Sequence, residues 1–276
     1  MSKNNPGGSL GDEEFAMPNF TTYSQLEEYM LKNHGYESSN NLFFKEEIKG
    51  LQIAEVGCGH GYITPILAKY ASFVTGFDVD AKALSHAKEL KQKLNINNID
   101  FQMFEDNLTS IQEYEPAISM DVIEHVPNPI TYLREINNML IKGGTLFIGT
   151  PNGLIARKNK CLIKMHNRFH IMEYSPNELQ AFLNNTVFYV ESFYSNYNVS
   201  GNGYDQLSTG RKIAIKFLCK VKLFELARKS LRKIRKSPKQ TPQSGNSVSD
   251  WVINATTANQ INAHNCDVII IKAIKK

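Results

Sequence analysis

The residues with the clearest chemical potential lie in one short segment, Asp121-Val-Ile-Glu124-His125. Two carboxylates and an imidazole stand three and four positions apart, so they share one face if the segment is helical. An imidazole can accept the proton of a substrate hydroxyl group near neutral pH, which makes His125 a candidate general base with Glu124 beside it. A histidine that only ties the loop together is the alternative. His170, which precedes Ile-Met-Glu-Tyr, is a third candidate catalytic residue.

A second chemical signal is a glycine-rich turn. The apolar run Ile53–Val56 carries Glu55 and is followed by glycines at positions 57, 59 and 61. Glycine serves where φ is positive or where a ligand approaches bare backbone, and a helix that starts behind such a turn offers free N–H groups. The spacing differs from the dinucleotide fingerprint G-x-G-x-x-G, because Tyr62 occupies the place of the third glycine.

An acidic residue ends the next predicted strand. Asp78 lies 21 residues after Gly57, at an offset where a carboxylate can accept hydrogen bonds from ribose hydroxyls. Asp80 competes for the same role, and an aspartate that only shapes a turn is the alternative.

These motifs together resemble two known patterns. Glu55 and the three glycines resemble the first motif of class I S-adenosylmethionine methyltransferases. Asp121 to Pro129 resembles the segment after strand four of the ubiquinone-biosynthesis O-methyltransferases and the type 11 and type 23 methyltransferase-domain group. The resemblance covers about Leu51 to Phe193 and the last strand. It implies S-adenosylmethionine as methyl donor, S-adenosylhomocysteine as product, and a hydroxyl of a small molecule or glycan as acceptor.

The resemblance also implies a donor-binding set. An acidic residue after the third strand meets the adenine amino group in this family, and Asp106 is the best match, with a solvated loop as the alternative. The implied donor-binding residues are Glu55, Gly57, Cys58, Gly59, Gly61, Asp78, Val79, Asp106, Asn107, Met120 and Asp121. The implied catalytic residues are His125, Glu124 and His170.

A metal-assisted alternative follows from a second likeness. In the small-RNA 2′-O-methyltransferases, a Glu-x-x-Glu-His segment and a later histidine hold a divalent ion, and the quartet here would be Asp121, Glu124, His125 and His170. Mixed oxygen and nitrogen ligands suit Mg²⁺, Mn²⁺ or Fe²⁺. Asp121 is one methylene shorter than the family's glutamate, so a site without metal is the expectation. The hypotheses are therefore a small-molecule or glycan O-methyltransferase, a metal-assisted RNA 2′-O-methyltransferase, and a donor-binding adaptor without catalysis.

The elements that must position these residues alternate between strand and helix. This pattern predicts an α/β fold with a doubly wound, mostly parallel, seven-stranded sheet of the Rossmann-like methyltransferase kind. Helices are expected at Tyr23–Lys32, Tyr62–Tyr70, Ala81–Leu94, Ile130–Leu140 and Leu179–Leu183, the last opened by a capping box at Ser175. The strands are expected at Leu51–Val56, Phe73–Phe77, Ile99–Phe104, Ala117–Met120, Thr145–Gly149, Val187–Phe193 and Val268–Ile271.

The chain divides into four predicted parts. They are a disordered N-terminus (1–14), a helical N-terminal cap (15–50), the methyltransferase core (51–194 plus 266–276) and a helical insertion before the last strand (195–265). The insertion is expected to hold a basic amphipathic helix (211–236) and a flexible link (237–249). Residues 211–239 contain 12 Lys and Arg against one acid, a net charge of +11, which leaves the rest at −7 with 19 basic and 26 acidic residues.

The basic helix has three interpretations. It could cover the core with a solvated charged face, which is slightly favoured, contact an anionic membrane surface, or bind a polyanion. Nucleic acid is the least favoured partner, because aromatic residues are not interleaved with the charges. No apolar run approaches the ~20 residues of a membrane span, and the four cysteines are isolated, which favours a reduced compartment and argues against a cysteine zinc site. The expected location is the cytoplasm, with peripheral membrane contact as an option. The sequence indicates no oligomeric state.

Overall fold

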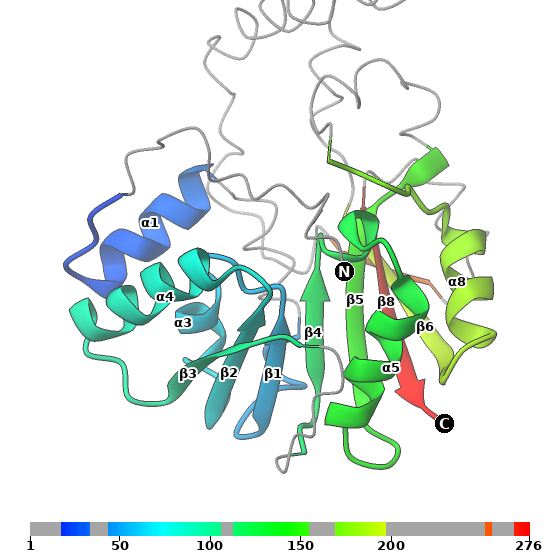
Figure 1. Cartoon of the computed structure of the whole chain (residues 1–276), viewed down its shortest axis with the longest axis horizontal. Coiled ribbons are helices and arrows are strands. Elements are labelled where there is room, and N and C mark those ends of the chain that lie inside the picture. Colours follow the sequence, from blue (N-terminus) through cyan, green and yellow to red (C-terminus); the bar gives the residue numbers. More distant parts are fainter. Residues whose placement is uncertain (1–17, 34–43, 106–112, 155–168, 197–251, 256–267) are drawn as a thin grey trace, which may run out of the picture.

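A computed structural model describes residues 18–33, 44–105, 113–154, 169–196, 252–255 and 268–276. Its centre is an eight-stranded sheet with the order β3-β2-β1-β4-β5-β8-β6-β7 (Figure 1). The strands are β1 (Gln52–Val56), β2 (Phe73–Asp78), β3 (Ile99–Met103), β4 (Ala117–Met120), β5 (Thr145–Pro151), β6 (Phe188–Asn196), β7 (Val252–Ala255) and β8 (Val268–Lys275).

The sheet confirms the predicted fold class and adds one strand to it. Strands β1 to β5 pair in parallel, and β8 runs antiparallel between β5 and β6. The last two predicted strands, Val187–Phe193 and Val268–Ile271, are present as the antiparallel neighbours β6 and β8. The count of seven was one short, because β7 pairs antiparallel with the outer side of β6. The four residues of β7 lie within the predicted insertion (195–265), and their strand form depends on pairing with the distant β6.

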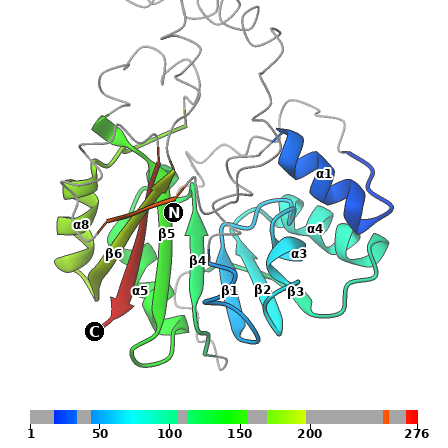
Figure 2. The same ribbon diagram turned by 180° about the vertical axis from the view of Figure 1, so that it is seen from behind.

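Helices cover both faces of the sheet (Figures 1 and 2). Successive side chains of a strand point to opposite faces, and the core divides in the same way. Ile53 packs in one buried cluster with residues of α3 and α4, whereas Ala54 packs in a second cluster with residues of α5 and α8. The helices are α1 (Tyr23–Asn33), α3 (Thr64–Leu67), α4 (Ala81–Lys93), η2 (Ile123–His125, a 3₁₀ turn), α5 (Pro129–Met139) and α8 (Pro176–Asn184).

The helix starts show which local signals were correct. The capping box at Ser175 is present, with Ser175 and Glu178 bonded reciprocally. The helix expected at Tyr62–Tyr70 is shorter: α3 begins at Thr64, with Pro65 in its first turn, because the glycine turn continues through Ile63. Proline is tolerated there, since its missing N–H group has no partner in a first turn.

Several predicted features lie outside the described residues. They are the N-terminus 1–14, the basic helix 211–236 and the link 237–249. Within the part of the chain that the structure describes, no helix is long and apolar enough to cross a membrane.

Glu55 joins β1 to the helix behind the glycine turn. Its side chain is buried, and one carboxylate oxygen accepts a hydrogen bond of 2.6 Å from the Thr64 hydroxyl of α3. The pKa of Glu55 is raised from 4.5 to about 7, chiefly by burial; the Thr64 hydrogen bond opposes this rise, and the nearby Asp78 charge adds to it. The ligand-free fold therefore favours a neutral Glu55 side chain.

Replacing Glu55 by glutamine should stabilise the ligand-free protein at alkaline pH and change little at acidic pH. Glutamine keeps an oxygen for Thr64 and carries no charge. The folded pKa lies above the ordinary value, so the stability from protonated Glu55 is complete below about pH 4.5 and is lost as pH rises through about 7. A shift of this size corresponds to at most about 3 kcal/mol.

Urea unfolding of Glu55→Gln and the wild type at about pH 5 and about pH 8 measures this difference. Glu113→Gln, at an exposed carboxylate, is the matched control. If Glu55→Gln and the wild type differ in unfolding free energy by the same amount at both pH values, ionisation of Glu55 does not cause the pH dependence.

Candidate active site

The glycine turn after β1 is shaped for close backbone approach. Gly57, Gly59 and Gly61 all have positive φ, at 85°, 53° and 75°. The N–H groups of Gly57 and Cys58 donate to the Phe77 carbonyl at 2.7 and 3.0 Å, which fixes the turn against β2. A Cβ at Gly59 would meet nothing within 4 Å, so this backbone is open to a ligand.

The two competing aspartates have different tasks. The Asp78 carboxylate accepts from the Gly59 N–H at 2.7 Å and from the Asp80 N–H at 2.9 Å. The Asp80 side chain instead caps α4, accepting from the Lys82 and Ala83 N–H groups. Asp78 is therefore the carboxylate that lies at the glycine turn, and the following residue, Val79, is 62 % exposed beside it.

Other residues of the predicted donor-binding set have side chains that a ligand reaches less directly. Cys58 is buried, and burial raises the pKa of its thiol far above the ordinary value, so only its backbone is available to a ligand. Met120 ends β4. Its sulfur lies 2.4 Å from the position that a Cβ on Gly149 would occupy. Asp106 and Asn107 lie outside the described residues, so their adenine contacts stay predictions.

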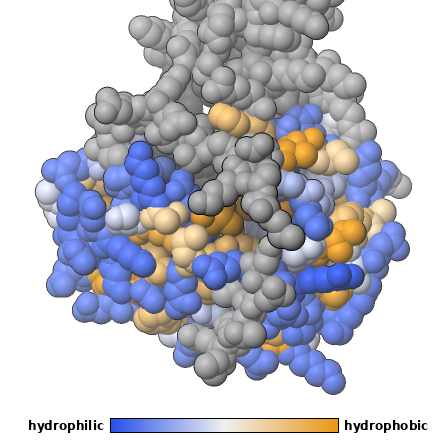
Figure 3. Space-filling model, viewed as in Figure 1, coloured by the Kyte–Doolittle hydropathy of each residue, from blue (hydrophilic) through white to orange (hydrophobic). Residues whose placement is uncertain are grey.

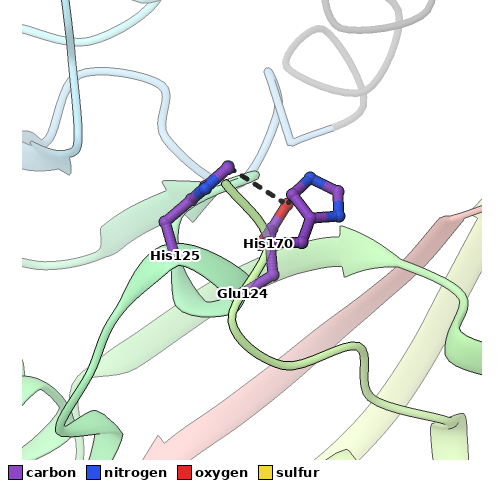
Figure 4. A group of neighbouring side chains, drawn as sticks. All are labelled: Glu124, His125 and His170. Atoms are coloured by element: carbon purple, nitrogen blue, oxygen red, sulfur yellow. Dashed lines mark ion pairs between the residues drawn. The ribbon is translucent and has the colours of Figure 1, made fainter. Parts of the chain in front are cut away.

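Glu124, His125 and His170 converge at the same edge of the sheet (Figure 4). Glu124 is 1 % exposed, and its Oε2 accepts a hydrogen bond of 2.9 Å from the Thr150 hydroxyl at the end of β5. Its Oε1 lies 4.0 Å from Nε2 of His125 and 4.0 Å from Nε2 of His170. Among the described residues, this buried oxygen has no hydrogen-bond partner.

Backbone hydrogen bonds bring the distant His170 to this cluster. The N–H groups of Ile171 and Met172 both donate to the Glu124 carbonyl, at 2.7 and 3.2 Å. The Gly153 N–H donates to the Tyr174 carbonyl. A Cβ on Gly153 would lie 2.5 Å from the Glu173 backbone carbonyl oxygen, so only glycine lets the two backbone segments come this close. The segment after β5 and the segment after β4 are thus joined.

The electrostatics favour neutral side chains in this cluster. Burial raises the pKa of Glu124 well above its ordinary value, and the charges of Asp121 and Glu173 add to the effect. Burial lowers the pKa of His125, and burial together with His125 lowers that of His170 to about 4. Burial thus favours the uncharged form of both imidazoles.

The tautomer of His125 follows from its surroundings. Its Nδ1 lies 3.2 Å from the Phe169 carbonyl oxygen, which can only accept. In the neutral ring, Nδ1–H donates to this oxygen, which leaves the lone pair on Nε2. The side chain is 32 % exposed, against 12 % for His170, so His125 is the more accessible base.

The cluster also has the composition of a cation site. Glu124, His125 and His170 offer ligand atoms that all lie within 4.8 Å of one another. The unpartnered buried oxygen of Glu124 fits a positively charged neighbour. Asp121, the fourth member of the predicted quartet, is not in this set; it has φ of 55° and its N–H donates to the Gly149 carbonyl.

Sequence reasoning missed two neighbours of the cluster. The Phe169 carbonyl sets the tautomer of His125, and the Glu173 carboxylate lies 3.5 Å from Nδ1 of His170. The His-x-x-Glu spacing was a usable signal for Glu173, whereas a backbone carbonyl gives none. Ile171 and Met172 are about half exposed beside His170, and Figure 3 shows hydrophobic residues reaching the surface on this view of the molecule. This edge of the sheet therefore exposes apolar as well as polar groups.

Comparison with known proteins adds relatives in sequence. The ubiquinone biosynthesis O-methyltransferase of Coxiella burnetii is 34 % identical over 107 residues, which cover 38 % of this chain and 45 % of that protein. The enzyme of the same name from Glaesserella parasuis is 29 % identical over 122 residues, covering 42 % and 49 %. The chain spans about half the length of these curated relatives.

Solved structures share the fold. The YcgJ protein of Bacillus subtilis matches 87 % of this chain and 99 % of its own, with a TM-score of 0.56 and 14 % identity. A protein of Thermotoga maritima described as a SAM-dependent methyltransferase, possible histamine N-methyltransferase, matches 92 % and 96 %, with a TM-score of 0.57 and 15 % identity. At these identities the likeness concerns the fold alone.

The family model described as a methyltransferase domain matches residues 47–209, more than half of the chain. This range includes the glycine turn, Asp78 and the Glu124, His125 and His170 cluster. The sequence-based expectation of a class I methyltransferase with S-adenosylmethionine as cofactor is thereby confirmed, and the chain belongs to the methyltransferase-domain family.

Proposed function

We propose that this protein transfers the methyl group of S-adenosylmethionine to a hydroxyl group of a small molecule or glycan. The observation that carries the proposal is the contact of 3.2 Å between His125 Nδ1 and the Phe169 carbonyl, because a neutral ring that donates there keeps its lone pair on Nε2. Ligands of open α/β sheets bind beyond the carboxyl ends of the strands, and His125 follows β4 there. The names of the sequence relatives, which are O-methyltransferases, support oxygen as the acceptor atom.

The residues divide into donor and acceptor groups. S-adenosylmethionine supplies a methyl group on a sulfonium, which is already a good leaving group. The backbone of Gly57 to Gly61 and the Asp78 carboxylate bind and orient the donor. The protein then has to hold the acceptor oxygen in line and remove its proton, so that much of the rate comes from positioning.

His125 removes the proton of the acceptor hydroxyl, and Glu124 stabilises the charged form of His125. Nε2 of His125 accepts the hydroxyl proton as the oxygen becomes nucleophilic. The ring then becomes an imidazolium, and the Oε1 atom of Glu124, 4.0 Å away, favours that charge when the carboxyl group is ionised. Thr150 keeps the carboxyl group in place through its hydrogen bond to Oε2.

A second candidate is a metal-assisted hydroxyl methyltransferase, for which an RNA 2′-hydroxyl is one possible acceptor. The compact set of Glu124, His125 and His170 favours it, because a carboxylate and two imidazoles suit a divalent transition ion. These three residues would hold the ion, which supplies a Lewis acid that lowers the pKa of the acceptor hydroxyl. Contact of 211–236 with a membrane surface stays a prediction.

Replacing Asp78 by alanine should weaken S-adenosylhomocysteine binding by roughly 10- to 100-fold. The change removes the ribose acceptor and the partner of the Gly59 N–H, and hydrogen bonds to a charged group each contribute about 1.5–3 kcal/mol. Isothermal titration calorimetry measures the dissociation constant. Asp100→Asn, on the neighbouring strand β3, is the control, and unchanged affinity in Asp78→Ala would exclude Asp78 from the donor site.

His125→Ala should lower kcat by about 10²- to 10⁴-fold, the usual contribution of a general base, while S-adenosylhomocysteine binding is retained. Single-turnover methyl transfer from labelled donor, tested over a panel of phenolic and glycan acceptors, measures the chemical step. Glu113→Gln serves as the remote control. Undiminished turnover in His125→Ala would remove it as the base.

A chelator distinguishes the two candidate functions. Without a metal, incubation with EDTA and dialysis should leave the rate of methyl transfer unchanged, since His125 needs no ion to accept a proton. Loss of activity that returns with Mg²⁺ or Mn²⁺, together with metal content in the purified protein, would favour the metal-assisted reaction. A His170→Ala variant with reduced metal content would then assign the ligand.

A further inference from the structure

We propose that the N-terminal helix α1 is a functional part of the donor site, because it positions the glycine turn through Tyr62. Phe20, which precedes α1, and Tyr29 within it both contact the Tyr62 ring. This inference rests on donor binding at Gly57 to Gly61, which belongs to the proposed function. It adds Phe20, Tyr29 and Tyr62 as positioning residues, none of which belongs to the donor-binding motif.

The contacts form a continuous series of rings. The centroids of Phe20 and Tyr62 are 5.7 Å apart with the planes at 88°, and those of Tyr29 and Tyr62 are 6.1 Å apart at 61°. Phe20 and Tyr29 also pack edge to face, at 5.1 Å. On the other side, the Tyr62 ring stacks on His60, which lies between Gly59 and Gly61 in the turn. The series therefore runs from the N-terminal helix into the donor loop itself.

Helix α1 is anchored firmly enough to act as a support. Leu26 and Met30 are fully or almost fully buried against Ile66 and Leu90. Lys69 forms an ion pair of 2.5 Å with Glu27, and its ammonium lies 4.2 Å from the centre of the Tyr23 ring. The Tyr23 hydroxyl also donates a hydrogen bond to the Pro65 carbonyl in α3. Figures 1 and 2 show α1 beside α4 and above α3.

The glycine turn needs such a support. Three glycines in five residues give it more conformational freedom than a turn without glycine would have, and ordering that backbone opposes ligand binding. Hydrogen bonds to Phe77 and Asp78 hold the side of the turn that faces β2. The Tyr62 ring stacks on His60 within the turn, so contacts of Tyr62 with Phe20 and Tyr29 order this part of the turn before the donor arrives. A loop that is ordered in advance binds its ligand more tightly.

The experiment is a double-mutant cycle on the full chain, with S-adenosylhomocysteine as the probe. Phe20→Leu and Tyr62→Leu should each weaken binding by about tenfold, as expected from the loss of aromatic contacts. The double variant should bind no more weakly than the worse single variant, because both changes remove the same contact. Tyr62→Phe, which keeps the ring, should retain affinity. In the methyl-transfer assay, KM for the donor should rise while kcat at saturating donor is retained.

A control of equal structural severity separates positioning from general loss of stability. Phe188→Leu changes a fully buried ring in β6, in the core cluster of α5 and α8, and should lower the melting temperature without changing donor affinity more than about twofold. The inference is overturned if Phe20→Leu lowers the melting temperature but leaves donor affinity intact, or if the two effects add. If the wild type does not bind S-adenosylhomocysteine, the proposed donor site itself fails.

Discussion

The contact between Gly57 and Val122 is the constraint on which the site depends. A Cβ at Gly57 would lie 2.2 Å from Cγ2 of Val122, so no other residue fits, and φ of 85° excludes most side chains independently. Val122 belongs to the segment that carries Asp121, Glu124 and His125. The close approach therefore places the glycine turn after β1 directly against the segment after β4. Methyl transfer needs this proximity, because donor and acceptor must meet within bonding distance.

The second determinant is a buried carboxyl group between two imidazoles. Burying a charge without a partner is costly, so the protein holds Glu124 with a raised pKa and both histidines with lowered ones. One oxygen is satisfied by Thr150, and the other faces the two rings. The same arrangement suits a proton acceptor supported by a carboxyl group, and it suits a cation. Both uses need the convergence that the hydrogen bonds of Ile171 and Met172 to Glu124 provide.

The two halves of the site come from different halves of the sheet. The glycine turn and Asp78 lie at the ends of β1 and β2, whereas the candidate catalytic residues follow β4 and β5. The family match includes both halves, from residue 47 to 209. The matched segments of the sequence relatives cover less than half of this chain.

The sequence by itself determined the features that depend on neighbouring residues. Three glycines at alternate positions specified a turn with positive φ, the Ser175 capping box specified a helix start, and strand–helix alternation specified the parallel sheet. Only the tertiary structure decided which aspartate lies at the donor turn, because Asp78 and Asp80 have the same chemistry and differ in their partners. It likewise showed that His125 meets the Phe169 carbonyl 44 positions away, that Asp121 stays outside the three-residue cluster, and that β7 extends the sheet. Local patterns encode backbone conformation and burial, whereas the meeting of distant side chains depends on strand register and on hydrogen bonds between loops, which no short stretch of sequence contains.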